Sequence, residues 1–181
     1  MPLSLKIVLV CTVLAAGLFD LRYRRIPNWL SLSAIAIGLG ANLFLFALHG
    51  FVFALLGMGC SLLIYVPLYL VRGMGAGDVK LMAAIGAIVG PWNWLGIFLF
   101  TALLGGLVSL LYVLLRRRMH QTFLNLGMIV SDLLRVRLPA KREARLDIRH
   151  AEALRLPHGA VIALGAIVFL SVGSRFITSL I

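Results

Sequence analysis

The chain has few acidic residues. Of its 181 residues only six are Asp or Glu, against 17 Lys and Arg, and charged residues of both signs make up 13% of the sequence. An ordinary soluble domain carries about 25% charged residues, so this composition does not fit a water-exposed globular fold. Apolar residues account for 62% of the chain instead, which predicts an integral membrane protein.

Cysteine is also scarce. Cys11 and Cys60 lie singly within apolar runs, and no Cys-x-x-Cys or Cys/His group has the spacing of a zinc site. We therefore expect neither a metal nor a cofactor. The alternating glycines Gly73, Gly75 and Gly77 are not a dinucleotide-binding loop either, because that fingerprint needs a preceding strand and a different glycine spacing.

Long apolar runs recur along most of the chain. Because about 20 apolar residues cross a hydrocarbon core as a helix, the runs predict an all-α bundle of about six transmembrane helices in one membrane domain, residues 1–181. Asp20 and an arginine cluster stand where a signal peptide would be cleaved, so the first run is expected to stay as a span. The expected crossings are Leu3–Phe19, Trp29–Leu48, Phe51–Val71, Asp78–Gly90, Trp94–Leu115 and His158–Leu180.

The fourth expected crossing is too short to span a membrane alone. We therefore expect the preceding "GMGAG" to enter the membrane as re-entrant, irregular backbone, which lipid tolerates only where protein or water surrounds it. Gly86 and Gly90, with Ala83 and Ala87 beside them, form a small-residue stripe suited to close helix packing. Trp92 and Trp94, in the turn that follows, are expected at the membrane interface.

In a soluble protein the formal charge of +11 would suggest binding to nucleic acid. Here the positions of the charges along the chain indicate the membrane topology instead. With these six spans, all Lys and Arg except Lys6 and Arg175 fall on one side, which the positive-inside rule makes cytoplasmic. We therefore expect no nucleic-acid partner. Residues 116–156 are expected to form an interfacial helix and then a basic cytoplasmic loop attracted to anionic lipid.

Asp20 and Asp78 are the two acidic residues that fall within or beside the expected spans, both on the cytoplasmic side. Carboxylates there are costly and so are candidate functional groups. Two close carboxylates can share one proton: the ionised one deprotonates a water while the neutral one donates to a carbonyl oxygen, as in aspartic proteases. Helix dipoles favour Asp20, at a helix end, as the acid and Asp78, at a helix start, as the base, although the roles can exchange.

Simpler interpretations stay open at this point. Asp20 can pair with Arg24 one turn further on, and Asp78 can cap a helix while Lys80 reaches the interface. A small proton-coupled transporter would use both aspartates, but they lie near one face rather than at the midplane where such sites are found. A non-catalytic subunit of a secretion apparatus would need them only for assembly.

Three segments resemble the type IV prepilin peptidases. "DLRYRRIPN" (20–28) resembles the first-aspartate signature of that family and "GAGDVKLMAAIG" (75–86) its second. "LPHGAVIALG" (156–165) resembles a further segment, usually Pro-aromatic-Gly, with His158 in place of the aromatic residue. The resemblance covers nearly the whole chain.

This resemblance implies a membrane aspartyl endopeptidase of the inner membrane that removes the leader of prepilins or pseudopilins on the cytoplasmic side. Asp20 and Asp78 would be its catalytic pair. The longer members also methylate the new N-terminus and carry a paired-cysteine domain; the chain has no such cysteines, so we do not expect methylation, and it resembles the short Flp/Tad-type peptidases. The residues expected to form the active-site loop or bind substrate are Gly75, Gly77, Lys80, Arg24, Pro27 and Asn28.

Overall fold

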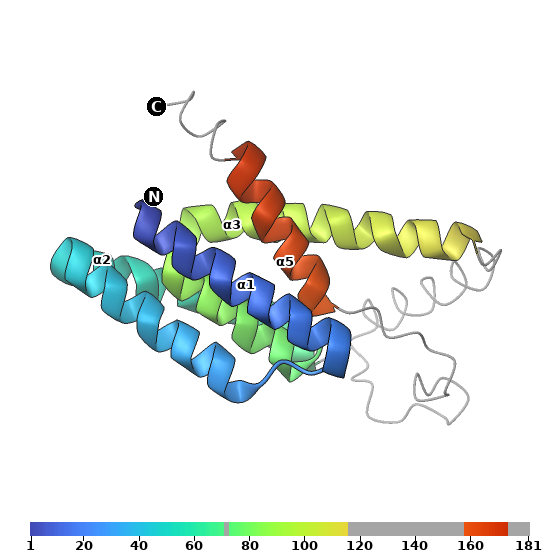
Figure 1. Cartoon of the computed structure of the whole chain (residues 1–181), viewed down its shortest axis with the longest axis horizontal. Helices are drawn as coiled ribbons and strands as arrows, with labels where there is room; N and C mark the ends of the chain where they lie inside the picture. Colours follow the sequence, from blue (N-terminus) through green and yellow to red (C-terminus); the bar gives the residue numbers. More distant parts are fainter. Residues whose placement is uncertain (71–72, 116–157, 174–181) are drawn as a thin grey trace, which may run out of the picture. The chain divides into compact units, whose positions relative to one another are not determined.

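The computed structural model describes residues 1–70, 73–115 and 158–173, which are helical apart from short connections (Figure 1). No strand occurs in these residues. The helices are α1 (Leu3–Tyr23), α2 (Asn28–Leu70), α3 (Ala76–Leu115) and α5 (His158–Val168), followed by a π-helical turn, η2 (Phe169–Gly173). The predicted all-α fold is confirmed for this part of the chain.

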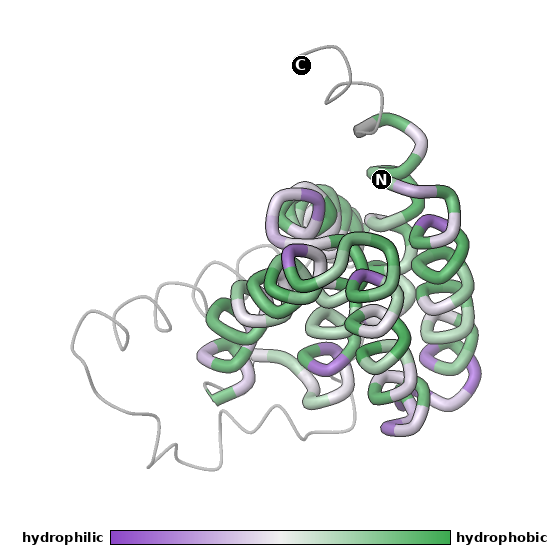
Figure 2. Tube along the Cα trace, turned by 90° about the vertical axis from the view of Figure 1, so that its left-hand side faces the viewer, coloured by the Kyte–Doolittle hydropathy of each residue, from purple (hydrophilic) through white to green (hydrophobic). Residues whose placement is uncertain are grey.

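Three of the described helices, α1, α2 and α3, are long and apolar enough to cross a membrane. Apolar residues dominate along them (Figure 2). By contacts the chain divides into two compact units, Met1–Gly105 with Pro157–Ile181, and Gly106–Leu156. The helices α1, α2 and α5 belong to the first unit, as does α3 up to Gly105. The interfacial helix and basic loop predicted at 116–156 lie outside the described residues.

The helix α2 folds back on itself. Ala47 has non-helical dihedral angles (φ 54°, ψ −145°), close to the expected turn between the crossings Trp29–Leu48 and Phe51–Val71. A Cβ atom on Gly50 would overlap the carbonyl oxygen of Asn42, whereas the same stretch of straight helix would separate these residues by about 12 Å. The two arms of α2, before and after Ala47, are therefore antiparallel.

The helix α3 is broken in the same way at Gly90 (φ 74°, ψ 177°), which Pro91 follows. The first arms of α2 and α3 run parallel, and so do their second arms, so α3 must also reverse where α2 does. The contacts that define these directions are Asn28–Lys80 and Asn42–Ile88 for the first arms, and Gly57–Gly90 and Tyr65–Phe98 for the second arms. Both reversals lie near predicted turns, while the count of six crossings stays a prediction.

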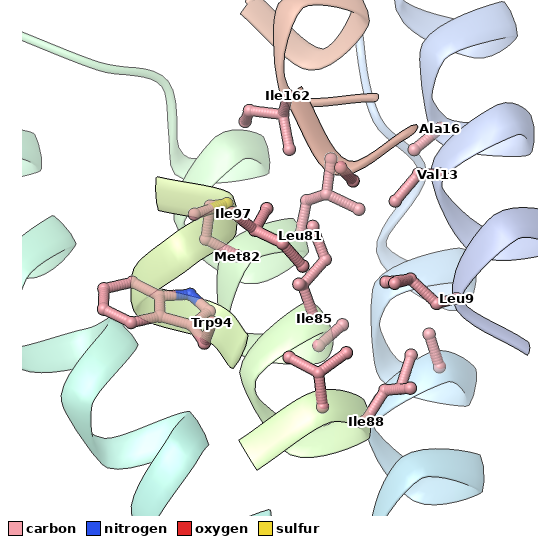
Figure 3. Close-up of a cluster of buried hydrophobic side chains, with 14 of the residues drawn as sticks. Leu9, Val13, Ala16, Leu81, Met82, Ile85, Ile88, Trp94, Ile97 and Ile162 are labelled. Atoms are coloured by element: carbon pink, nitrogen blue, oxygen red, sulfur yellow. The ribbon is translucent and has the colours of Figure 1, made fainter. Parts of the chain in front are cut away.

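The first arm of α3 lies at the centre of the unit. Residues 81–90 are all buried, so protein surrounds this part of the helix on every side. Its side chains meet Leu9 and Val13 of α1 and Ile162 of α5 in one hydrophobic cluster (Figure 3). Because α3 begins at Ala76, Gly77 is already helical, and the predicted re-entrant segment is not confirmed.

The small-residue stripe of α3 does pack closely, as predicted. A Cβ atom on Gly86 would overlap the carbonyl oxygen of Gly57, and one on Gly90 would overlap the ring of Phe53. Small residues let helix backbones approach in lipid, where no hydrophobic effect drives helices together. The glycines thus set the distance between α2 and α3.

The break in α3 leaves backbone carbonyl groups without their usual partners, and Asn42 of α2 supplies the donor. Pro91 has no N–H to give to the carbonyl of Ala87, four residues earlier. The Asn42 side-chain amide donates to the carbonyl oxygens of Ala87 (3.1 Å) and Ile88 (3.1 Å), and to Gly38 in its own helix (2.9 Å). One buried amide therefore stabilises the reversal.

The prediction for Trp94 is wrong. Trp92 is 76% exposed, but Trp94 is 1% exposed and stacks on Phe98 with ring centroids 5.6 Å apart. Residues two apart on a helix point about 200° apart, so after the reversal at Gly90 the two indoles face opposite ways. Trp94 packs against Tyr65 of α2 instead of lying at the interface.

Gly57→Ala should destabilise the fold strongly, since the new methyl group would overlap Gly86 and lie 2.8 Å from the backbone of Gly90. We expect a loss of about 1–3 kcal/mol or more in the free energy of unfolding, measured in detergent. Gly59→Ala, in the same helix arm with nothing within 4 Å, is the control and should unfold like wild type. Equal stability of the two variants would contradict the glycine contact.

Asn42→Leu should leave the carbonyl groups of Ala87 and Ile88 unpaired in a buried place, at a cost of about 1–3 kcal/mol. Asn93→Leu is the matched control, because half-buried Asn93 makes one amide bond, to Val89 in its own helix (3.1 Å). Unfolding of both variants in the same detergent measures the difference. If Asn42→Leu is no less stable than Asn93→Leu, the amide does not support the break.

Candidate active site

The two predicted motifs meet in space. The Lys80 ammonium group, in the first turns of α3, donates to the Asn28 side-chain oxygen at the start of α2 (2.9 Å). A Cβ atom on Gly77 would lie 3.3 Å from the Cβ atom of Ile26. The turn between α1 and α2 therefore packs directly against the beginning of α3.

This turn has a defined shape. Arg24 ends α1 in the left-handed conformation (φ 52°) and donates its N–H to the carbonyl of Asp20 (2.8 Å). Pro27 lies directly before α2, and its carbonyl oxygen accepts from the N–H of Ser31 (3.4 Å).

Asp20 lies in the last turn of α1 and is 8% exposed. Its Oδ2 atom accepts hydrogen bonds from the backbone N–H groups of Gly159 (2.8 Å) and Ala160 (3.3 Å). These residues belong to the first turn of α5, where N–H groups have no partner within the helix and where the helix dipole attracts negative charge. Asp20 of the first helix thus caps the last described α-helix.

This contact changes two expectations about Asp20. Within the described residues the Arg24 side chain makes no ion pair with the Asp20 carboxylate, and the carboxylate binds α5 instead. The expectation that Asp20 is the acid rested on the dipole of α1 alone. The beginning of α5 opposes that dipole, so helix dipoles no longer separate the roles of the two aspartates.

Asp78 lies in the first turn of α3 and is partly buried. Its N–H donates to the carbonyl of Gly75 (3.1 Å), and a Cβ atom on Gly75 would lie 3.4 Å from its carboxylate. Asp78 is within electrostatic range of Asp20 and of His158, the first residue of α5. The structure therefore brings the two predicted aspartates into one site.

Several residues at this site were not predicted. The resemblance covers the segment with Gly159 and Ala160 but implies a role for neither, because a backbone donor leaves no signal in a side chain. Tyr65 of α2 is also within electrostatic range of Asp78. It is 2% exposed, and its ring is held edge-on by Trp94 and Phe98. It lies in an apolar run that offers no pattern to mark it.

The chemistry available here is proton transfer between carboxylates. In the part of the chain that the structure describes, no three His, Cys, Asp or Glu residues are grouped as metal ligands. Two carboxylates that interact, at the ends of apolar helices and next to a polar turn, suit the sharing of one proton. Fold and site together define a helical membrane protein with a paired-aspartate centre.

The family follows from sequence comparison. The model of the Type IV leader peptidase family matches residues 7–110, more than half of the chain and both aspartates. The chain belongs to this family. The match ends before α5, so the cap on Asp20 comes from outside the matched residues.

Two curated relatives are named prepilin leader peptidase/N-methyltransferase. The one from Escherichia coli (strain K12) is 37% identical over 115 residues, which are 60% of this chain and 51% of the relative. The one from Xanthomonas campestris pv. campestris is 33% identical over 134 residues, 67% of this chain and 44% of the relative. The chain thus spans about half the length of the curated relatives it matches. No solved structure gives a significant match.

The cap can be tested without any assay of activity. Asp20→Ala removes the acceptor from α5 and should cost about 0.5–2 kcal/mol of stability, as the loss of other helix caps does. Asp20→Asn keeps one oxygen acceptor and should retain most of that stability. Unfolding in detergent, together with amide hydrogen exchange at Gly159 and Ala160, measures both effects. Equal unfolding and exchange in the two variants would rule out the cap.

Proposed function

We propose that this protein is a membrane aspartyl endopeptidase that removes the leader peptide from type IV prepilins or pseudopilins, with Flp-type pilins as the substrate class. Membership of the leader peptidase family and the names of the two relatives support this proposal. The observation that carries it is that Asp20 and Asp78, from helices far apart in the sequence, lie within electrostatic range of each other.

In the proposed mechanism a water molecule lies between the two carboxylates. The ionised carboxylate takes a proton from this water, whose oxygen attacks the carbonyl carbon of the scissile bond. The neutral carboxylic acid donates its proton to the carbonyl oxygen, giving a neutral tetrahedral intermediate. The first aspartate then gives its proton to the leaving amine while the second aspartate takes a proton from one hydroxyl group of the intermediate, so the peptide bond breaks and both aspartates return to their starting protonation states.

The residues around the pair are proposed to hold the substrate. Gly75 is exposed and Gly77 is half-buried, so an extended peptide can approach their backbone without meeting a side chain. The bond between Lys80 and Asn28 fixes a positive charge near Asp78. Arg24 and Pro27 shape the turn that faces these residues.

We propose six membrane crossings with the aspartates on the cytoplasmic side of the inner membrane. The reversals at Ala47 and Gly90 support four of these crossings, each an arm of α2 or α3. The non-helical residues before Ala76 would then lie at membrane depth beside the site. An apolar substrate helix can lie in the lipid next to the bundle while its leader reaches the aspartates, and anionic lipid would attract the basic segment at 116–156.

Asp78→Asn and Asp20→Asn should each lower the rate of leader cleavage by about 10²–10⁴-fold, since each removes one partner of the proton transfer. The assay uses membranes containing the full chain and a co-expressed prepilin whose leader ends in glycine, with the product identified by N-terminal sequencing. Asp147→Asn, outside the proposed pair, is the charge-matched control.

The outcome also separates the alternatives. Cleavage by Asp78→Asn at the wild-type rate would end the protease proposal. Normal pilin maturation in both variants together with loss of complex formation would point to an assembly subunit. Loss of proton-coupled uptake with normal cleavage would point to a transporter.

A further inference from the structure

The beginning of α5 contacts Asp20 more closely than a helix cap alone requires. We propose that this helix start positions the Asp20 carboxylate for catalysis, and that Gly159 is a positioning residue whose N–H and lack of a side chain are both needed. The inference rests on the proposed function, because it concerns the same aspartate. It adds a residue that lies outside the family match.

Hydrogen bonds from α5 occupy one of the two carboxylate oxygens of Asp20. The N–H groups of Gly159 (2.8 Å) and Ala160 (3.3 Å) both point at the same atom, Oδ2. Backbone N–H groups can only donate, so an oxygen that accepts from two of them is poorly placed to receive a proton as well. The proton that Asp20 exchanges during cleavage then belongs on the other oxygen, Oδ1.

Steric contact at Gly159 is equally close. A Cβ atom on Gly159 would lie 3.0 Å from the Cβ and Oδ2 atoms of Asp20 and 3.1 Å from its Cγ atom. These distances are shorter than ordinary contacts between carbon atoms, which lie at about 3.5–4.0 Å. A side chain at position 159 would press against three atoms of the buried Asp20 side chain. Any residue other than glycine must therefore displace the carboxylate or the helix.

The helix α5 cannot easily move away from α1 to relieve that contact, because on its opposite face a Cβ atom on Gly165 would lie 2.8 Å from the Cα atom of Thr101 in α3. One turn further along the interface between α1 and α5, a Cβ atom on Gly17 of α1 would lie 3.1 Å from the Cβ atom of Ala163. The helices α1 and α5 therefore touch closely at Gly159 and again one turn later at Ala163. The first residue of α5, His158, is also within electrostatic range of Asp78, so a shift of α5 would be felt by both aspartates.

The test compares two glycine variants of the same interface in the full chain. Gly159→Ala should lower kcat of leader cleavage by up to about 10²-fold, the loss that a misplacement of a catalytic group by about 1 Å can cause, with little change in KM. Gly17→Ala introduces an equally tight contact between α1 and α5 without touching the carboxylate. It should keep most of the wild-type kcat, and thermal unfolding in detergent should show similar stability for both variants.

Asp20→Asn and Asp78→Asn in the same assay separate the two proposals. If these variants cleave normally, the proposed function fails. If they are inactive but Gly159→Ala and Gly17→Ala have the same kcat, only the positioning role of Gly159 fails. A rise in KM with unchanged kcat for Gly159→Ala would also overturn it, since that result indicates substrate binding.

If Gly159→Ala does not fold, a cross-link between α1 and α5 tests the positioning role of α5 instead. Gly17→Cys with Ala163→Cys, in a chain with Cys11 and Cys60 replaced by Ser, should form a disulfide on mild oxidation, because these Cβ atoms lie only slightly nearer than the roughly 3.5–4.5 Å of disulfides. With α5 locked on α1, kcat should stay as in the reduced form. Absence of the cross-link, or loss of activity that reduction restores, would overturn the inference.

Discussion

A chain in lipid must satisfy its backbone hydrogen bonds within itself, and this constraint governs both the break in α3 and the start of α5. At the break in α3, the amide of Asn42 donates to carbonyl groups that a proline leaves without a partner. At the start of α5, the carboxylate of Asp20 accepts from N–H groups that no helical turn precedes. In each case a polar side chain from an earlier helix completes a later one. Polar residues of this apolar bundle therefore hold helix ends in place.

The packing of the helices also explains why the site lies at one end of the bundle. The first arm of α3 is buried on every side, so its one carboxylate near the helix start can be reached only from that end of the bundle. The turn after α1 packs there as well, through Ile26 against Gly77. Close glycine contacts keep α2 and α3 at a fixed distance, and the contact of Ile26 with Gly77 holds the turn after Asp20 against the start of α3.

The sequence was sufficient for the features that depend on local pattern. Apolar runs predicted the helices, and Gly90 with Pro91 marked a turn because both residues disturb a helix. The two aspartate motifs pointed to one shared site, and the structure brings them within electrostatic range, while their catalytic roles stay a prediction. Features that depend on docking could not be predicted. Trp94 faces the core because of where α3 reverses, and the donors to Asp20 are backbone atoms of a helix far away in the chain.

The cap of α5 on Asp20 also has a consequence for biosynthesis. The helices enter the membrane in the order in which the ribosome makes them, so α1 with Asp20 is present from the start and α3 with Asp78 follows. The contact that holds Asp20 comes from α5, after the long segment at residues 116–157. A nascent chain therefore carries both aspartates before the helix that caps Asp20 has been made. On the proposed function and the proposed role of α5, the site is complete only when α5 has joined α1.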